Sequence, residues 1–511
     1  MRHNSSFAGS ILALASAALA AESVPAAATP PSDAVTVEKQ LVSYSIQYQQ
    51  LVDWAGTPDA PNDYSVNMLK NLGSITGKMP IIRVGGTTQD DTVYHAGQTD
   101  VPVYSNGNND QGYKRPTQYI GPGFFDSYQV FPNTSYIAGL NLARQGTNSG
   151  DGSSARDSLL AIAEQSCAAL GDNLHLLEMG NEPDLYVNYG RRDNPYTADE
   201  YVSEWKDAVA AVRAGPCGNA PFFANSFTGA GGAGPKPGDS FNAGQNSDNA
   251  ITEVSEHNYM RAASGASLQD DLMSHPAITA KIAGHTDLMS TIASQNLPYT
   301  LGECNSLYGG GANQGLSDVL GSALWAIDFT LWAAVSNIRR LHFHQALNNP
   351  YNAWAPAAST DYPKGTLASY YGHVFTARVV GSEPDVQLAN IPLADSNYEA
   401  AYAAYAGGKL ARVAVVNMRQ YNAGSGTRAT KTYDVQVGEG FTTAKIERLQ
   451  AAGSDSTTGL TLGGMEFEVG TLGVPAAAAG APSNSVETVS VQGGVVSVTT
   501  ESSEAVLITL S

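Results

Sequence analysis

Charged residues are scarce in this sequence, and the basic residues are the scarcest of them. Asp, Glu, Lys and Arg make up 14% of the 511 residues, where about a quarter is usual. The 27 basic residues face 47 acidic ones, which gives a net charge of -20, and no run of Lys or Arg occurs. This balance argues against nucleic acid and anionic membranes as partners. The surface must instead depend on Ser, Thr, Asn, Gln and Gly, as in many secreted proteins that meet carbohydrate.

Cysteines and long apolar segments are also few. Only three cysteines occur, and their spacing matches no metal-binding motif, so we expect neither a metal nor a cofactor. Cys167 and Cys217 each follow a predicted amphipathic helix and precede a predicted strand. This placement makes them neighbours and predicts a disulfide between them, with Cys304 as a buried free thiol. No segment after residue 20 is apolar for long enough to span a bilayer.

The first 20 residues have the composition of a signal peptide. A basic start at Arg2 precedes an apolar run of small residues, and Ala18-Leu19-Ala20 fits a cleavage site. We therefore expect a secreted, extracellular protein. The chain after this segment contains one sequon, Asn133-Thr134-Ser135, which predicts a glycan on Asn133 if its loop is exposed.

Short apolar runs alternate with helical periodicity through the first two thirds of the chain. The runs end in turn residues and lack the alternation of a strand with one solvated face, so they predict buried parallel strands. Eight are recognised, at 41–46, 80–84, 136–142, 174–179, 221–224, 251–258, 298–302 and 338–344. Apolar spacing of three and four residues predicts helices between them, as at 155–170 and at 198–214, where Thr197 provides an N-cap.

Eight strands alternating with helices predict an α/β fold, a (β/α)8 TIM barrel over residues 41–381. A doubly wound sheet is the alternative; the barrel is favoured because the strand number fits and polar residues follow several different strands. Segment 87–134 lacks helical periodicity, which predicts a large loop on the active-site side. From residue 382 short strand patterns recur between turns, which predicts a C-terminal antiparallel β-sandwich over 382–511. Residues 21–40 form an extended leader that can add a strand to this sandwich.

Two carboxylates follow strands on opposite sides of the predicted barrel. Glu182 follows the fourth strand, within Gly-Asn-Glu-Pro, and Glu303 follows the seventh, within LGECNS. The carboxyl ends of the strands are where such barrels carry their chemistry. Glycoside hydrolysis needs one acid to protonate the leaving oxygen and one carboxylate to attack or to activate water. The sequence does not give the separation of the pair, so retention and inversion are both open at this point.

Asn-Glu-Pro after the fourth strand and Gly-Glu after the seventh resemble glycoside hydrolase clan A, whose members are retaining enzymes. More narrowly, the chain resembles glycoside hydrolase family 79, which contains fungal and bacterial β-glucuronidases and the heparanases. The motifs that carry this resemblance are, in order, IIRVGGTTQD, LLEMGNEPD, HNY, LGECNS and LHFHQ. The resemblance covers almost the whole chain after the signal peptide. It implies a retaining β-glucuronidase of the fungal type, acting on β-linked glucuronic or 4-O-methylglucuronic acid in glycans.

The resemblance also implies roles for residues of this sequence. Glu182 is the implied acid/base, Glu303 the implied nucleophile, and Asn181 the residue that binds the sugar's 2-hydroxyl. The other implied site residues are Arg83 under Glu303, Tyr259 beside it, His257, His344 and Gln345 on the floor, and Tyr308 and Tyr351 on the sugar's carboxylate. Neutral hydroxyl donors would let an acidic protein bind an acidic sugar.

Other interpretations stay open. Arg83 can form a structural ion pair, Tyr259 can be a core aromatic residue, and the floor residues can be core groups that are satisfied by hydrogen bonds. One functional alternative is a clan A retaining β-glycosidase for a neutral sugar, a β-xylosidase or β-galactosidase. A second is a catalytically inactive carbohydrate-binding cell-wall protein, against which the presence of both glutamates argues. The natural polymer, exo or endo action, pH optimum and oligomeric state are not predicted.

Overall fold

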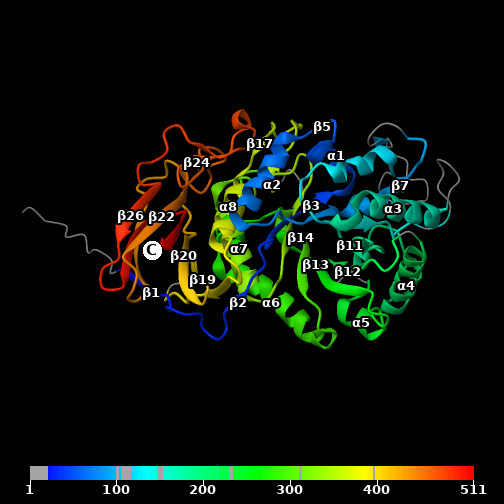
Figure 1. The fold of residues 1–511 in the computed structure, drawn as a ribbon, viewed down its shortest axis with the longest axis horizontal. Helices are drawn as coiled ribbons and strands as arrows, with labels where there is room; N and C mark the ends of the chain where they lie inside the picture. The colour runs from blue at the N-terminus through cyan, green and yellow to red at the C-terminus, as the bar shows by residue number, and fades with distance from the viewer. Residues whose placement is uncertain are drawn as a thin grey trace, which may run out of the picture.

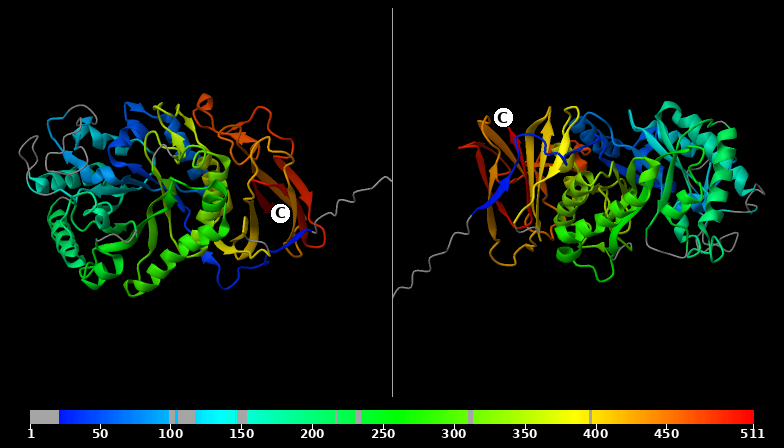
Figure 2. Two further views of the ribbon diagram at one scale, coloured as in Figure 1. Left: turned by 180° about the vertical axis from the view of Figure 1, so that it is seen from behind. Right: turned by 90° about the horizontal axis from the view of Figure 1, so that it is seen from below.

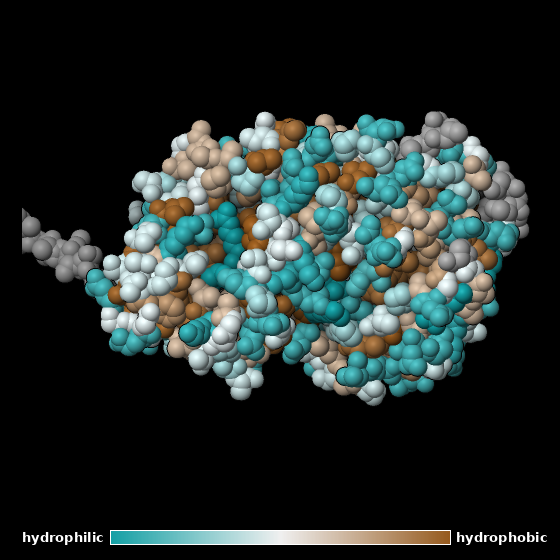
Figure 3. Space-filling view, viewed as in Figure 1, coloured by the Kyte–Doolittle hydropathy of each residue, from teal (hydrophilic) through white to brown (hydrophobic). Residues whose placement is uncertain are grey.

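The protein consists of a barrel and a β-sandwich that pack side by side (Figure 1). The structure is a computed structural model and describes residues 21–98, 103–104, 117–144, 146, 154–215, 217–229, 234–309, 313–394 and 397–511. The predicted signal peptide lies outside these residues. No helix within them is long and apolar enough to cross a membrane. On the face shown in Figure 3, hydrophilic and hydrophobic residues are interspersed over both domains.

Eight parallel strands close into a barrel, which confirms the predicted fold class. In pairing order they are β3 (Val42–Gln47), β6 (Ile82–Gly85), β10 (Tyr136–Leu140), β11 (Leu174–Met179), β12 (Phe222–Phe227), β13 (Ile251–Ala262), β14 (Tyr299–Tyr308) and β15 (Leu341–Gln345). The helices of this domain are α1 (Leu51–Ala55), α2 (Asp63–Thr76), α3 (Ala155–Leu170), α4 (Ala198–Ala214), α5 (Pro237–Asn242), α6 (His275–Thr291), α7 (Leu320–Val335) and α8 (Ala368–Val380). Helices outside and side chains inside exclude water from the strands, which explains their continuous apolar character.

Helix α4 shows how local sequence sets the position of an element. The Thr197 hydroxyl accepts a hydrogen bond from the Glu200 N–H (3.2 Å), and the Glu200 carboxylate accepts one from the Thr197 N–H (2.8 Å). This capping box satisfies donors that the first turn of a helix otherwise leaves unpaired. Trp205, on the buried face, packs edge-on against Phe222 of β12. The helix therefore starts where predicted and covers the barrel with its apolar side.

Strands β13 and β14 are longer than predicted. The sequence placed their ends at residues 258 and 302, whereas the structure continues them to Ala262 and Tyr308, which pair with each other. Pairing beyond the barrel rim supplies hydrogen bonds that the backbone of a loop would have to find elsewhere. Glu303 therefore lies inside a strand, not directly after one.

Segment 87–134 contains more regular structure than the predicted loop. Its described part begins with the 3-10 turn η2 (Thr87–Asp91) and continues with β7 (Thr92–Tyr94), β8 (Val103–Tyr104), β9 (Gln118–Ile120) and the 3-10 helix η3 (Pro122–Gln129). The three strands form a small sheet. Phe124, Phe125 and Tyr128 pack against one another. Aromatic packing thus orders a segment that has no helical or strand periodicity, while residues 99–102 and 105–116 lie outside the described part.

The sandwich combines the C-terminal residues with the N-terminal leader. Its main strands are β18 (Gln387–Asn390), β19 (Glu399–Ala406), β20 (Lys409–Asn417), β21 (Thr430–Gln436), β22 (Thr443–Gln450), β26 (Val486–Ser490), β27 (Val495–Glu501) and β28 (Glu504–Leu510). From the leader, β1 (Glu22–Pro25) pairs in parallel with β21, and β2 (Val35–Thr36) pairs antiparallel with β18. Figure 2 shows β1, in blue, on the C-terminal sandwich. Every other pairing in the sandwich is antiparallel among the described residues.

Short strands complete the described fold. They are β4 (Gly56–Thr57), β5 (Ala60–Pro61), β16 (Trp354–Ala355), β17 (Gly365–Thr366), β23 (Thr461–Leu462), β24 (Met465–Glu466) and β25 (Ala476–Ala477). Cys167 in α3 and Cys217 after α4 form a disulfide, the pair that their positions predicted, and Cys304 is a buried free thiol. Asn133 is exposed, as a glycan-bearing residue must be.

A buried polar cluster joins the barrel to the sandwich. Asp328 of α7 is fully buried and accepts hydrogen bonds from Nδ1 of His275 (2.9 Å), at the start of α6, and from the Tyr402 hydroxyl of β19 (2.5 Å). Burial acts to lower the pKa of His275, but the hydrogen bond to Asp328 and its charge outweigh burial, so the pKa is raised. The folded protein therefore favours the charged imidazolium.

We expect His275→Gln to destabilise the protein more in acid than in base. A raised folded-state pKa gives stability that is fully present below the unfolded pKa of about 6.5 and is lost as the pH rises through the folded value. Thermal melts should show a Tm lowered by about 2 °C near pH 5 and by less near pH 9. His373→Gln is the matched control of opposite sign: burial lowers the pKa of His373 to about 3, so this residue costs stability below the unfolded pKa of about 6.5, and its replacement should lower the Tm less near pH 5 than near pH 9. An equal loss for His275→Gln at both pH values would contradict the charged pair.

Candidate active site

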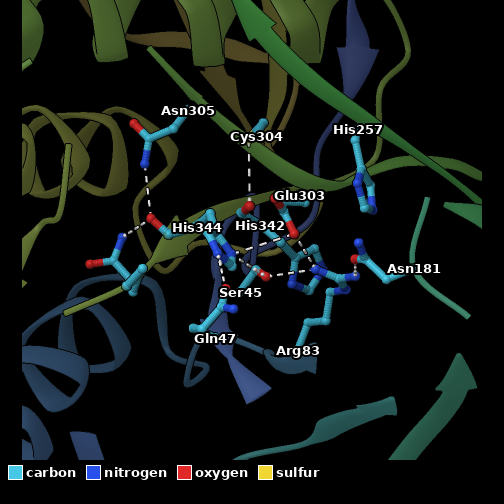
Figure 4. Close-up of polar contacts among 12 residues, drawn as sticks. Ser45, Gln47, Arg83, Asn181, His257, Glu303, Cys304, Asn305, His342 and His344 are labelled. Carbon is cyan, nitrogen blue, oxygen red and sulfur yellow. Dashed lines mark hydrogen bonds and ion pairs between the residues drawn. The ribbon is translucent and has the colours of Figure 1, made fainter. Parts of the chain in front are cut away.

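The predicted site residues converge at the carboxyl end of the barrel. Figure 4 shows Arg83 from β6, Asn181 after β11, His257 from β13, Glu303 from β14 and His344 from β15 around one centre. These residues are up to 261 positions apart in the chain, from 83 to 344. Closure of the barrel is what brings them together.

Glu182 is held in a tight turn directly after β11. Gly180 and Glu182 both have positive φ, 81° and 52°, a conformation that is costly for a residue other than glycine. Two hydrogen bonds donated by backbone N–H groups hold the turn in place. The N–H of Glu182 donates to the carbonyl of Ser226 (2.9 Å), and the N–H of Asn181 donates to Oδ2 of Asp90 (2.9 Å). The turn directs the Glu182 carboxyl toward β13, where Oε1 lies 3.0 Å from Nδ1 of His257.

Hydrogen-bond donors hold Glu303 from two sides. The Tyr259 hydroxyl donates to Oε1 (2.7 Å), and Nη1 of Arg83 donates to Oε2 (2.8 Å). Nδ1 of His344 lies 3.5 Å from the same Oε2. Only 5% of Glu303 is exposed, so these contacts act at low dielectric, where charged hydrogen bonds are strong. The carboxylate is therefore fixed in orientation.

The two carboxyl groups are driven to opposite protonation states. Burial raises the pKa of Glu182 to about 8, and the charge of Glu303 adds to this, against the opposing effect of Arg83 and Arg191. Burial also acts to raise the pKa of Glu303, but the positive charges of His344, His257 and Arg83 outweigh it and hold that pKa well below its usual range. One protonated and one ionised carboxyl is the arrangement that an acid and a nucleophile require.

Arg83 is the cation that keeps Glu303 ionised near neutral pH. Burial lowers the pKa of His257 and of His344 to about 4, so both imidazoles are neutral there. The pKa of Arg83 is raised, because the charges of Glu178 and Glu303 outweigh the effect of its burial. Arg83 therefore remains as a positive charge beside the ionised Glu303 after the histidines lose their protons.

Arg83 also orients Asn181. It is fully buried, and it donates from Nε to Glu178 (2.8 Å), from Nη1 to Ser45 (2.8 Å) and from Nη2 to Oδ1 of Asn181 (2.7 Å). With its oxygen bound to Arg83, the Asn181 amide nitrogen has no hydrogen-bond partner among the described residues. A buried donor left without a partner is costly unless a ligand satisfies it. This nitrogen is thus a donor available to a sugar hydroxyl.

The separation of the two carboxylates is short. One oxygen of Glu182 and one of Glu303 lie within 4.8 Å of each other. Carboxyl groups are about 5–5.5 Å apart in retaining glycosidases and about 6.5–9.5 Å apart in inverting ones, which must fit a water between them. The spacing is therefore of the retaining kind.

The donor atoms of Glu182, Glu303 and His257 lie close enough to surround a metal ion. Both oxygens of Glu303 are already used, however, by Tyr259 and by the guanidinium of Arg83. A fixed positive charge at hydrogen-bond distance opposes the binding of a cation at the same oxygens. The chemistry of these residues fits a carboxylate pair better than a metal centre.

Three tyrosines lie beside the carboxylate pair. The ring of Tyr259 is 6.0 Å from that of Tyr351 and 6.1 Å from that of Tyr308, measured between centroids. Tyr351 is 5% exposed, whereas Tyr308, at the end of β14, is 54% exposed. Tyr351 is therefore held inside the protein, whereas Tyr308 is open to solvent beside Tyr259.

Gln345, predicted as a sugar contact, uses both polar atoms of its amide in hydrogen bonds to the backbone. The residue is fully buried, and its Oε1 accepts a hydrogen bond from the N–H of Ala353 (2.8 Å). Its Nε2 donates to the carbonyls of His344 (2.9 Å) and Phe343 (3.3 Å). The amide thus fixes the segment that follows β15. His344 itself contacts Ser45 through Nδ1 (2.9 Å) and Gln47 through Nε2 (2.8 Å).

Two buried carboxylates of the site were not singled out from the sequence. Glu178 holds Arg83 and was visible only as a charged residue that interrupts an apolar strand. A charge inside such a strand requires a partner, and this was the signal available. Asp90 lies in the segment predicted to be a loop, and the signal available was its place at the end of the motif IIRVGGTTQD.

Comparisons with known proteins show which family this chain belongs to. The model of the glycosyl hydrolase family 79 C-terminal beta domain matches residues 401–507. A β-glucuronidase of Aspergillus niger is 35% identical over 474 residues, which cover 86% of this chain and 85% of that protein. The chain belongs to glycoside hydrolase family 79. A β-glucuronidase of Neurospora crassa is 32% identical over 480 residues, 83% of this chain and 84% of that protein.

Solved structures place this family 79 glycoside hydrolase among similar folds. A 4-O-α-L-rhamnosyl-β-D-glucuronidase from Fusarium oxysporum, solved in a Rha-GlcA complex, superposes with a TM-score of 0.77 at 26% identity and covers 96% of this chain and 100% of that chain. A family 51 α-L-arabinofuranosidase from Bifidobacterium longum has a TM-score of 0.60 at 14% identity, covering 94% and 98% of the two chains. The second likeness shows a shared fold alone.

Proposed function

We propose that this family 79 enzyme is a retaining β-glucuronidase that releases β-linked glucuronic or 4-O-methylglucuronic acid from glycans. The observation that carries the proposal is the pair formed by Glu182 and Glu303, with oxygens within 4.8 Å and pKa values shifted in opposite directions. The β-glucuronidases of Aspergillus niger and Neurospora crassa, and the glucuronidase from Fusarium oxysporum, support the choice of sugar.

In the first step the carboxylate of Glu303 attacks the anomeric carbon. The bond from that carbon to the glycosidic oxygen breaks, and the proton of Glu182 goes to the leaving oxygen. A covalent glucuronyl ester of Glu303 results. Asn181, whose amide nitrogen has no partner among the described residues, donates to the 2-hydroxyl, a contact that strengthens in the transition state.

In the second step Glu182 acts as a base. It takes a proton from water as the water oxygen bonds to the anomeric carbon, and the ester bond to Glu303 breaks. Two displacements on one carbon give a product with the original β configuration. Glu182 ends protonated and Glu303 ends ionised, which are the states that their pKa shifts favour at the start.

Recognition of the sugar's carboxylate is assigned to Tyr351 and Tyr308. Burial, followed by the charge of Glu303, raises the pKa of Tyr351, so its hydroxyl remains protonated and can donate. A hydroxyl donor can bind an anion locally even though the protein as a whole carries -20.

The substrate assay separates this proposal from its alternatives. Hydrolysis of an aryl β-glucuronide, without hydrolysis of the matching aryl β-xyloside or β-galactoside, is the expected result. The reverse pattern would favour a β-glycosidase for a neutral sugar. Binding of glucuronides without turnover of any of the three would favour the carbohydrate-binding alternative. Proton NMR of the first-formed product should show the β anomer.

The alkaline limb of the pH profile should report Glu182. Since the pKa of Glu182 is raised to about 8 and the acid must be protonated, kcat/KM should fall as the pH rises through about 8. The measurement is kcat/KM for phenyl β-glucuronide, whose leaving group needs the proton. The Glu182→Ala variant should lose this limb, and a limb that persists in the variant would assign it to another group.

We further propose that the enzyme is secreted. The basic start, apolar run and Ala18-Leu19-Ala20 of the first 20 residues support export. The disulfide between Cys167 and Cys217 is typical of an oxidising compartment, and the exposed sequon at Asn133 suits a glycan. N-terminal sequencing of protein from the culture medium should then begin at Ala21.

A further inference from the structure

Asp90 is a buried carboxylate at the centre of three loops of the barrel. It belongs to η2, which follows β6, and 2% of it is exposed. Its Oδ1 accepts hydrogen bonds from the N–H groups of Leu142 (3.1 Å) and Ala143 (3.4 Å), in the loop after β10. Its Oδ2 accepts from the N–H of Asn181 (2.9 Å), in the loop after β11.

Two further donors contact the same Oδ2. The Tyr186 hydroxyl donates at 2.7 Å, and Nη1 of Arg191 lies at 3.5 Å. Both residues lie in the segment that follows the Asn181–Glu182 turn. Arg191 is in turn held by Asp91, 2.5 Å from its Nη2, and its guanidinium lies over the rings of Tyr186 and Tyr189.

Burial raises the pKa of Asp90, but its hydrogen-bond partners are those of an ionised carboxylate. Four of its five neighbours are N–H groups, which can only donate, and they approach both of its oxygens. The amide of an asparagine here would place its NH2 group, which is itself a donor, opposite at least one of these donors. Substitution by asparagine therefore keeps the size of the side chain but breaks a hydrogen bond that holds the turn.

We propose that Asp90 is a positioning residue for acid catalysis: it holds the Asn181–Glu182 turn and, together with Arg191, balances the charge around Glu182. The inference rests on the proposed function, in which Glu182 is the acid. Glu182 has positive φ, so its turn depends on external hydrogen bonds to stay in place. Asp90 provides the bond to the residue directly before it.

The charged groups around Glu182 determine the direction in which its pKa should shift in each variant. The ionisable groups that face it are Glu303, Arg83, Arg191, Asp90, His257, Asp184, Tyr259 and Tyr351. Those that face Asp90 are Arg191, Asp91 and Tyr186. The charge of Asp90 raises the pKa of Glu182, whereas that of Arg191 lowers it, in addition to the larger effects of burial and of Glu303. Removing Asp90 or Arg191 should thus move the alkaline limb in opposite directions.

The test compares two leaving groups in Asp90→Asn. Phenyl β-glucuronide needs the proton of Glu182 to leave, whereas 2,4-dinitrophenyl β-glucuronide does not. We expect kcat/KM to fall about 10- to 100-fold for the phenyl substrate and by less than about threefold for the dinitrophenyl substrate. The alkaline limb should move to lower pH in Asp90→Asn and to higher pH in Arg191→Gln.

Asp91→Asn is the matched control. It removes the neighbouring carboxylate from the same Arg191 while the bond from Asn181 to Asp90 is kept. The control should change kcat/KM for both substrates by the same factor. Equal losses for both substrates in Asp90→Asn, or the same leaving-group selectivity in Asp91→Asn, would overturn the positioning role.

A second variant keeps the test decisive if Asp90→Asn does not fold. Tyr186→Phe removes one donor to Oδ2 and should show the same selectivity with a smaller loss, while uniform loss in this variant would overturn the role. Circular dichroism and thermal melts check the fold of each variant. Failure of the wild-type enzyme to hydrolyse either glucuronide would instead refute the proposed function itself.

Discussion

Replacing Glu303 by glutamine should abolish the turnover of aryl β-glucuronides while the fold is kept. The amide has nearly the size of the carboxylate but is far too weak a nucleophile to attack the anomeric carbon. Its NH2 group must also face either Tyr259 or Arg83, both of which donate to this side chain. The expected loss of kcat is at least about 10³-fold. It is measured with 4-nitrophenyl β-glucuronide, alongside circular dichroism and a thermal melt.

Glu256→Gln is the matched control for this substitution. Glu256 also lies on a barrel strand, β13, and is buried. Burial, with a smaller effect of Asp184, raises its pKa well above the usual range, which favours the protonated carboxyl that an amide resembles. Near wild-type activity is expected for the control. Glu303→Gln should also yield no product of retained configuration when azide is added. If this variant keeps a rate within about tenfold of the wild type, Glu303 is not the nucleophile.

Replacing Glu182 by alanine should slow the enzyme most on substrates with poor leaving groups. Without the acid, the leaving oxygen departs unprotonated, and kcat/KM for phenyl β-glucuronide should fall about 10²- to 10⁴-fold. A 2,4-dinitrophenolate leaves without a proton, so the ester of Glu303 still forms from the activated substrate. Its hydrolysis is then slow, because no base activates the water.

Azide distinguishes this role from general damage to the site. As a small anion that needs no base, azide can attack the ester in place of water, at the position that the Glu182 side chain vacates. We expect it to restore turnover of the dinitrophenyl substrate in Glu182→Ala and to give β-glucuronyl azide. A product of inverted configuration would contradict retention, and equal losses on phenyl and dinitrophenyl substrates without rescue would contradict the acid/base assignment.

The sequence alone predicts the fold class and the two candidate catalytic carboxylates, Glu182 and Glu303. The alternation of short apolar runs with helical spacing predicts a barrel because buried strands and packed helices each leave a local pattern of apolar residues in the sequence. Asn-Glu-Pro follows one strand and Gly-Glu lies within another, and both motifs belong to the end of the barrel that carries its chemistry. The pairing of Cys167 with Cys217 follows similarly, since one lies in the last turn of α3 and the other shortly after α4.

Which polar residues lie together is seen only in the tertiary structure. Asp90 and Glu178 stand in the motifs IIRVGGTTQD and LLEMGNEPD, but the motifs do not show what these carboxylates hold; barrel closure places one on the Asn181–Glu182 turn and the other on Arg83. Gln345 fits the same motif as His344 but is turned into the backbone of the next segment. The distances between the site residues, their burial and their electrostatic surroundings all depend on segments that are far apart in the chain. The opposite pKa shifts of Glu182 and Glu303 therefore exist only once the barrel has closed and excluded water from both.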